Sequence, residues 1–136
     1  MSKIKILVVD DEEVVRLSHL RSLAGAECYV EAAWNGDDAL RAMERTPFDV
    51  VLLDLRMPGM DGLSVLKTIK GRWPDSEVII VTGYPSIDTA KEAVRLGAYD
   101  YLAKPVGPSD VLNATHGAMT HKKWGLHREK AASPAG

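Results

Sequence analysis

Short apolar runs rich in β-branched residues alternate with segments of helical period along this chain, and the alternation predicts a βαβ architecture. The predicted strands span residues 4–9, 29–33, 49–53, 78–82 and 99–103. The predicted helices span residues 12–24, 36–45, 62–72, 86–96 and 108–122. Most of the strands are apolar without interruption, which is typical of parallel strands covered on both faces. The second run is more polar and is the expected edge strand.

Side chains with acidic, hydroxyl or amine groups stand where four of these strands end. Asp10 and Asp11 follow the first strand, and Asp54 follows the third. Thr82 closes the fourth strand and Lys104 follows the fifth. Because the carboxyl ends of parallel strands share one edge of the sheet, we expect these side chains to converge in one pocket.

This set of groups favours phosphoryl transfer. Two carboxylates about 4 Å apart repel each other by roughly 4 kcal/mol at an effective dielectric near 20, so clustered acids need a counter-charge. Mg²⁺ prefers a few carboxylates together with water and phosphate oxygens. Asp54 is then placed as a nucleophile that forms an acyl phosphate, while Lys104 and Thr82 stabilise the oxygens of the transferred group.

Four segments resemble the receiver domain of two-component response regulators. The segments are Ile6–Glu12, Asp54–Gly62, Val81–Tyr84 and Gly97–Pro105. The resemblance covers roughly residues 3–122. It implies a three-layer, doubly wound (βα)5 fold with a five-stranded parallel sheet of order 2-1-3-4-5, and a receiver domain over residues 1–123.

The resemblance also implies a phosphoacceptor and a magnesium site. Asp54 matches the phosphoacceptor of the family. Asp11 would bind Mg²⁺ directly and Asp10 partly through water, with Asp54 and the backbone carbonyl of Arg56 completing the protein ligands.

Further roles follow from the same resemblance. Thr82 and Lys104 would contact the phosphoryl oxygens, and the Lys104-Pro105 bond matches one that is cis in the family. Tyr101 matches the aromatic switch residue, which rotates inward when Thr82 moves toward the phosphoryl group.

The resemblance implies signalling partners rather than turnover of a substrate. The donor would be a sensor histidine kinase or a phosphotransfer protein, and the chain would catalyse only its own phosphorylation and dephosphorylation. The face formed by the fourth helix, last strand and fifth helix would bind an effector domain or a downstream protein. A phosphorylation-dependent dimer is a further option.

Composition limits the binding partners and the cellular compartment expected for the chain. The net charge of −2 argues against direct nucleic-acid binding by this domain. Cys28 is the only cysteine, which fits a reducing compartment. No stretch approaches the roughly 20 apolar residues that span a membrane. We therefore expect a cytoplasmic protein.

The residues present disfavour three other interpretations. A phosphatase of the haloacid-dehalogenase type needs an aspartate two residues after the nucleophile, where this chain has Arg56. A flavodoxin-like carrier needs a phosphate-binding loop rich in Ser, Thr and Gly, whereas residues 10–13 are all acidic. A receiver that only docks would have lost site residues, and all five are present.

Local signals complete the prediction. The expected N-terminal helix caps are Asp11, Asn35, Asp61 and Ser86. The inner face of the first helix is expected at Val14, Leu17, Leu20 and Ala24. That of the fourth helix is expected at Ile87, Ala90 and Val94, and that of the fifth at Val111, Ala114, Thr115 and Ala118. Residues 124–136 are predicted to form a basic, flexible tail or truncated linker.

Overall fold

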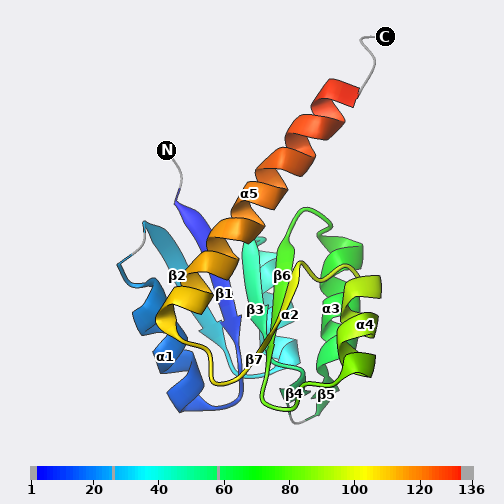
Figure 1. Cartoon of the computed structure of the whole chain (residues 1–136). Helices are drawn as coiled ribbons and strands as arrows, with labels where there is room; N and C mark the ends of the chain where they lie inside the picture. The colour runs from blue at the N-terminus through cyan, green and yellow to red at the C-terminus, as the bar shows by residue number, and fades with distance from the viewer. Residues whose placement is uncertain (1–2, 26, 58, 133–136) are drawn as a thin grey trace.

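The computed structural model describes residues 3–25, 27–57 and 59–132 as one α/β sandwich (Figure 1). The sheet strands are β1 (Ile4–Val9), β2 (Cys28–Ala33), β3 (Val50–Leu53), β6 (Glu77–Thr82) and β7 (Asp100–Ala103). The helices are α1 (Glu13–Leu23), α2 (Gly36–Arg45), α3 (Gly62–Arg72), α4 (Ile87–Arg95) and α5 (Pro108–Ala132). Between β3 and α3 the chain forms a small antiparallel hairpin, β4 (Arg56–Met57) and β5 (Met60–Asp61), which was not predicted.

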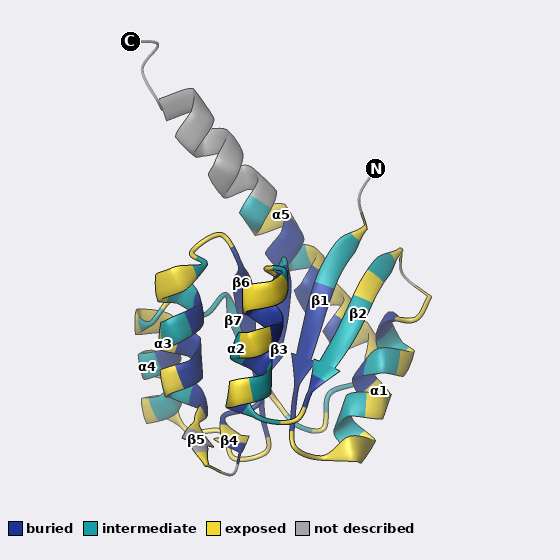
Figure 2. Ribbon diagram, turned by 180° about the vertical axis from the view of Figure 1, so that it is seen from behind, coloured by how far each residue is buried: buried dark blue, intermediate teal, exposed yellow. Residues whose placement is uncertain are grey.

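The sheet is parallel throughout and runs in the order β2-β1-β3-β6-β7. Without the hairpin strands this is the predicted order 2-1-3-4-5, and the more polar β2 lies at an edge as expected. Helices α1 and α5 cover one face, and α2, α3 and α4 cover the other (Figure 1). The central strands are buried on both faces (Figure 2). Alternate residues of a strand therefore join two separate hydrophobic cores.

The register of the parallel strands brings their carboxyl ends together. Val9 pairs with Leu53, so the residues that follow them in the chain are neighbours. The backbone N–H of Asp54 donates to the carbonyl of Val9 at 3.0 Å. In the same way, the N–H of Lys104 donates to the carbonyl of Thr82 at 2.8 Å. The predicted site residues thus continue the strand pairing by one step.

Three predicted helix caps are confirmed and one is wrong. The confirmed caps are Asn35, Asp61 and Ser86. The side chain of each accepts a hydrogen bond from a backbone N–H two or three residues further along the chain. Helix α1 instead has Glu12 at its N-cap, and no side chain caps it, so the prediction for Asp11 is wrong. The Glu12 N–H donates to Asp10 Oδ1 at 2.9 Å, which turns the chain from β1 into the helix.

The predicted inner face of α1 is also wrong. Val14 is 78% exposed and Leu17 is 46% exposed, whereas His19 and Leu23 are buried. The two buried positions are one turn apart, and Leu23 packs in the core between the sheet and α5. Burial lowers the pKa of His19, which favours a neutral imidazole inside the fold.

The other two predicted faces have different outcomes. In α4, Ile87 and Val94 are exposed and Ala93 is the buried residue, so that prediction is wrong. The small side chain of Ala93 lets the helix lie close to its neighbours, and the larger residues then point outward. In α5 all four predicted residues are buried, namely Val111, Ala114, Thr115 and Ala118.

Helix α5 is longer than predicted. Its backbone remains helical to Ala132, beyond the expected end at residue 122. The predicted flexible tail therefore overlaps the helix as far as Ala132, and residues 133–136 lie outside the described part. The domain boundary at residue 123 stays a prediction. Within the described ranges, no helix is long and apolar enough to cross a bilayer.

Candidate functional site

The predicted site residues meet at the carboxyl edge of the sheet. Asp10 is 2% exposed, Asp54 is 4% exposed and Thr82 is 1% exposed, although all three carry polar side chains. Lys104 is half-buried and Asp11 is exposed. A buried carboxylate is costly unless it is paired, so this arrangement needs a counter-charge.

Lys104 supplies that counter-charge. Its Nζ lies 2.7 Å from Asp10 Oδ2 and 3.4 Å from Asp54 Oδ2. Glu12 Oε1 lies 3.9 Å from the same atom. The amine of Lys104, which follows β7, thus connects acidic side chains that follow β1 and β3. The Lys104-Pro105 peptide bond is cis, as expected.

Burial and these charged neighbours shift the pKa values of Asp54 and Lys104. Burial raises the pKa of Asp54, and the charge of Asp10 adds to that effect, while hydrogen bonds from the Arg56 N–H and from Lys104 oppose it. Burial by itself would lower the pKa of Lys104. Its hydrogen bond and charge interaction with Asp10, and then those with Asp54, outweigh burial and raise that pKa. Lys104 therefore stays an ammonium ion next to Asp54.

The acidic loop after β1 fits a divalent cation. One carboxylate oxygen each from Asp10, Asp11 and Glu12 lies within 4.8 Å of the other two. Such oxygen ligands are those that Mg²⁺ prefers. Glu12 is an addition to the predicted ligands, and its only sequence signal is its place in an acidic run. Asp54 adjoins this group through Lys104.

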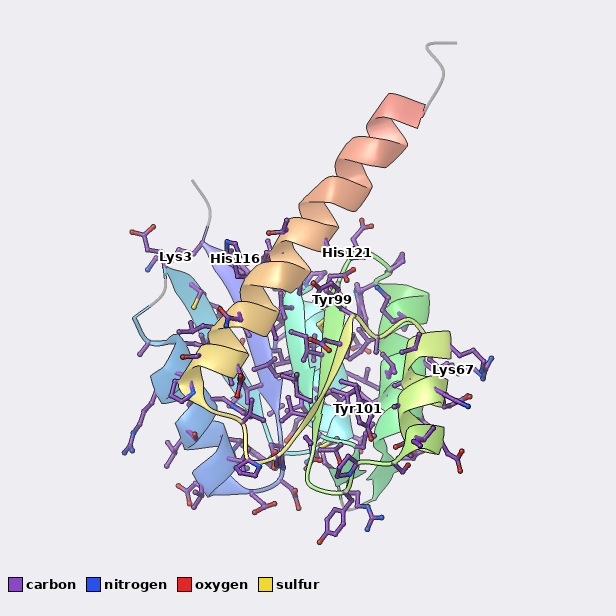
Figure 3. All side chains as sticks on the ribbon, viewed as in Figure 1. Lys3, Lys67, Tyr99, Tyr101, His116 and His121 are labelled. Atoms are coloured by element: carbon purple, nitrogen blue, oxygen red, sulfur yellow. The ribbon has the colours of Figure 1, made fainter. Side chains whose placement is uncertain are left out.

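Thr82 and Tyr101 belong to two neighbouring hydrogen-bond groups. Thr82 Oγ1 accepts a hydrogen bond from the Tyr84 N–H at 3.1 Å. The Tyr101 phenol oxygen lies 2.7 Å from Thr89 Oγ1 and accepts from the Ser86 N–H at 3.3 Å. Tyr101 therefore extends from β7 toward the start of α4 (Figure 3). The loop between β6 and α4 connects the two groups.

Arg56 and Arg16 contact the loops around the site. The Arg56 guanidinium lies 4.1 Å from the centre of the Tyr84 ring, and the Arg56 N–H donates to Asp54 Oδ1 at 3.2 Å. The side chains of Arg56 and Tyr84 are both exposed. Arg16 Nη1 donates to the carbonyl of Asp10 at 2.8 Å. Sequence reasoning did not predict this contact, because nothing distinguishes Arg16 from other helix-surface residues.

Comparison with known proteins identifies the family to which the chain is similar. The family model described as the response regulator receiver domain matches residues 6–116. The DNA-binding transcriptional regulator NtrC of Salmonella typhimurium is 41% identical over 116 residues, which is 85% of this chain and 25% of NtrC. The chain thus spans about a quarter of the length of this curated relative.

Solved structures show the same fold. A CheY-like response regulator receiver domain protein from Methanospirillum hungatei superposes with a TM-score of 0.86 at 30% identity, covering 90% of this chain and 98% of that one. NtrX from Brucella abortus also gives a TM-score of 0.86, at 32% identity, covering 96% of this chain and 29% of NtrX.

Proposed function

Because the chain belongs to the response regulator receiver domain family, we propose that it accepts a phosphoryl group on Asp54 and signals through the change that follows. Mg²⁺-dependent transfer to an aspartate is a general property of the family. One observation carries the assignment to Asp54: its buried carboxylate shares the Lys104 ammonium ion with Asp10. Asp54 is thus oriented and next to a cation that can follow the developing charge.

The reaction requires little movement of these groups. An oxygen of Asp54 attacks the phosphorus atom of a phosphohistidine, the P–N bond breaks, and the imidazole leaves with its electron pair. The Arg56 N–H holds Asp54 Oδ1 at 3.2 Å and so orients the carboxylate. The Lys104 ammonium ion then exchanges its carboxylate contacts for phosphoryl oxygens, and the Thr82 hydroxyl donates to another of them.

The acidic loop is the proposed place for Mg²⁺. Asp10, Asp11 and Asp54 would hold the ion together with the backbone carbonyl of Arg56, and Glu12 lies close enough to assist. A bound Mg²⁺ ion would neutralise negative charge on the phosphoryl oxygens. Without the ion, the Lys104 amine alone balances Asp10 and Asp54.

The output would begin at Tyr101. Phosphorylation replaces the single negative charge of the Asp54 carboxylate with a phosphoryl group that carries about two. Movement of Thr82 toward those charges would shift the loop between β6 and α4, which also contacts Tyr101. That shift would disturb the Tyr101–Thr89 contact at the start of α4. The exposed Ile87 and Val94 of α4 are then available to an effector domain, a downstream protein or a second copy.

The partners are proposals of the same kind. The donor would be a sensor histidine kinase or a phosphotransfer protein in the cytoplasm. The chemistry acts on the chain itself, so we propose a signalling phosphoacceptor and not an enzyme with an external substrate. Because this chain spans about a quarter of NtrC, a DNA-binding regulator, an effector of that type is part of the proposal.

A direct experiment tests the proposal. The full chain is incubated with Mg²⁺ and acetyl phosphate, and its intact mass is followed. We expect a gain of one phosphoryl group, located by peptide mapping to the segment that contains Asp54, and no gain in excess chelator. If phosphate is released repeatedly from simple esters instead, the phosphatase reading replaces this one.

The Arg56–Tyr84 stack makes a second prediction. Because these side chains meet over the loops that flank Asp54, Tyr84→Ala should admit water more readily and speed acyl-phosphate hydrolysis about fivefold. That factor corresponds to about 1 kcal/mol, the size of an exposed cation–π contact. Loss of the phosphoryl mass with time measures it. Tyr29→Ala is the matched control, since Tyr29 is an exposed tyrosine on β2. Equal lifetimes in the two variants would contradict a shielding role.

A further inference from the structure

Two acidic residues contact α5 at the amino edge of the sheet, opposite the phosphorylation site. His121 Nδ1 lies 3.0 Å from Glu77 Oε2, and Lys122 Nζ lies 2.7 Å from Asp49 Oδ1. Glu77 begins β6, and Asp49 immediately precedes β3. The ring of Tyr99 lies 5.2 Å from the ring of His121 (Figure 3). We call Asp49 and Glu77 the acidic socket.

The acidic socket is fixed by contacts from the rest of the domain. Asp49 Oδ2 accepts a hydrogen bond from the Lys5 N–H at 2.9 Å, and Glu77 Oε1 lies 3.6 Å from Lys70 Nζ. The side chain of Glu77 is 9% exposed and that of Lys122 is 17% exposed. The side chain of His121 is 63% exposed, so the Lys122–Asp49 pair is the less screened of the two contacts. That pair holds the helix more firmly than an exposed salt bridge would.

We propose that the acidic socket pins α5 at residues 121 and 122, so that residues 123–132 continue as a rigid arm. Figure 1 shows that α5 extends beyond the edge of the sheet at this point. The direction of the arm is then set by the two strands whose opposite ends lead to Asp54 and Thr82.

The position of the pin also determines how α5 can move. At 1.5 Å per residue, the socket contacts lie about 20 Å from the start of the helix and about 15 Å from its end. The helix begins just after the loop that carries Lys104. A displacement of that loop would therefore move α5 together with its buried face, and the arm with it. This movement rests on the proposed function, whereas the pinning does not.

Hydrogen exchange of the unphosphorylated full chain tests the pinning, so its outcome is independent of phosphorylation chemistry. The variant is the double substitution His121→Gln and Lys122→Gln, which removes the imidazole and the ammonium group but keeps residues of good helix propensity. We expect the amides of residues 121–132 to exchange at least about fivefold faster than in the wild type. His116→Gln, an exposed position on the same helix, should exchange like the wild type.

Two results would overturn the proposal. One is wild-type exchange over residues 121–132 in the double variant. The other is a uniform rise over the whole chain, including β1 and β3, which would mean general destabilisation instead of a local pin. Asp49→Asn and Lys122→Gln should also be non-additive when combined, because each removes the same contact. Additive effects on exchange would count against the socket.

Discussion

Replacing Asp54 with asparagine is expected to abolish phosphorylation of the chain. Asparagine has nearly the same shape, and its amide oxygen can still accept the Arg56 N–H, but it is not a nucleophile toward phosphorus. Intact mass after incubation with Mg²⁺ and acetyl phosphate measures the effect. The exposed Asp37→Asn on α2 is the matched control and should be phosphorylated like the wild type. Full phosphorylation of Asp54→Asn would place the phosphoacceptor elsewhere.

The same substitution should stabilise the metal-free protein at neutral pH. Burial raises the pKa of Asp54 above its ordinary value of 3.8, so the folded state binds this proton more tightly than the unfolded state does. The stabilising contribution is therefore full below pH 3.8 and is lost as the pH rises through the folded-state pKa. At pH 7 the charged carboxylate opposes folding, and asparagine removes that charge.

The expected gain is a melting temperature about 2–5 °C higher than that of the wild type at pH 7, as roughly 1 kcal/mol gives in a chain of this size. Lys104 retains its 2.7 Å contact with Asp10, so the variant does not leave the amine unpaired. The difference between the variants should shrink on acidification toward pH 4. Thermal melts in chelator over this pH range measure it. A difference that grows on acidification would show that Asp54 is stabilised as the anion.

The parts of the fold that follow from local sequence were predicted well. Residues 50–53 form an uninterrupted apolar run, and the structure buries all of them in a central strand. The bounds of α2 and α3 match the predicted ranges, because a side-chain cap defines the start of each helix and a proline follows two residues after each end. Once the strands are parallel and in this order, Asp54 has to follow beside Asp10. The convergence of the site is thus a consequence of strand order.

The rotation of helices was not predictable in the same way. Val14 and Ile87 are apolar and lie in the first turns of their helices, yet both are largely exposed, while His19 is buried. Which side of a helix becomes buried depends on the elements that pack against it. In α1, the Asp10–Glu12 turn that leads out of β1 sets the rotation of the helix. Helical periodicity indicates that one side of a helix is buried. It does not identify that side when apolar residues lie on several sides of the helix.

Contacts between distant residues account for the remaining differences. Glu77 and His121 are 44 positions apart, and nothing in either local sequence indicates that they meet. The stacking of Arg56 on Tyr84 depends on how two loops approach each other, which neither local sequence indicates. Glu12 differs from its acidic neighbours only in where the turn places its oxygens. These features require the tertiary structure.

Gly62→Ala is expected to be strongly destabilising, although it adds a single methyl group. A Cβ at this position would lie 2.4 Å from Leu55 Cα, 2.7 Å from Leu55 O and 2.8 Å from Asp54 O. All three are backbone atoms, so no side chain can rotate to make room. The Gly62 N–H also donates to Leu55 O at 3.1 Å, which holds the start of α3 against the strand end.

Relief of this clash requires the backbone of Asp54 and Leu55, or the first turn of α3, to move. We expect a loss of about 3 kcal/mol, at the upper end for overpacking, and a melting temperature roughly 10 °C lower. Gly71→Ala on the same helix is the control: its Cβ would meet nothing within 4 Å, so it should be neutral or slightly stabilising. Urea denaturation of both variants gives the comparison. Equal stability would mean that the start of α3 does not press on the backbone at Asp54. Slower phosphorylation of the folded Gly62→Ala variant would show in addition that this contact positions the carboxylate.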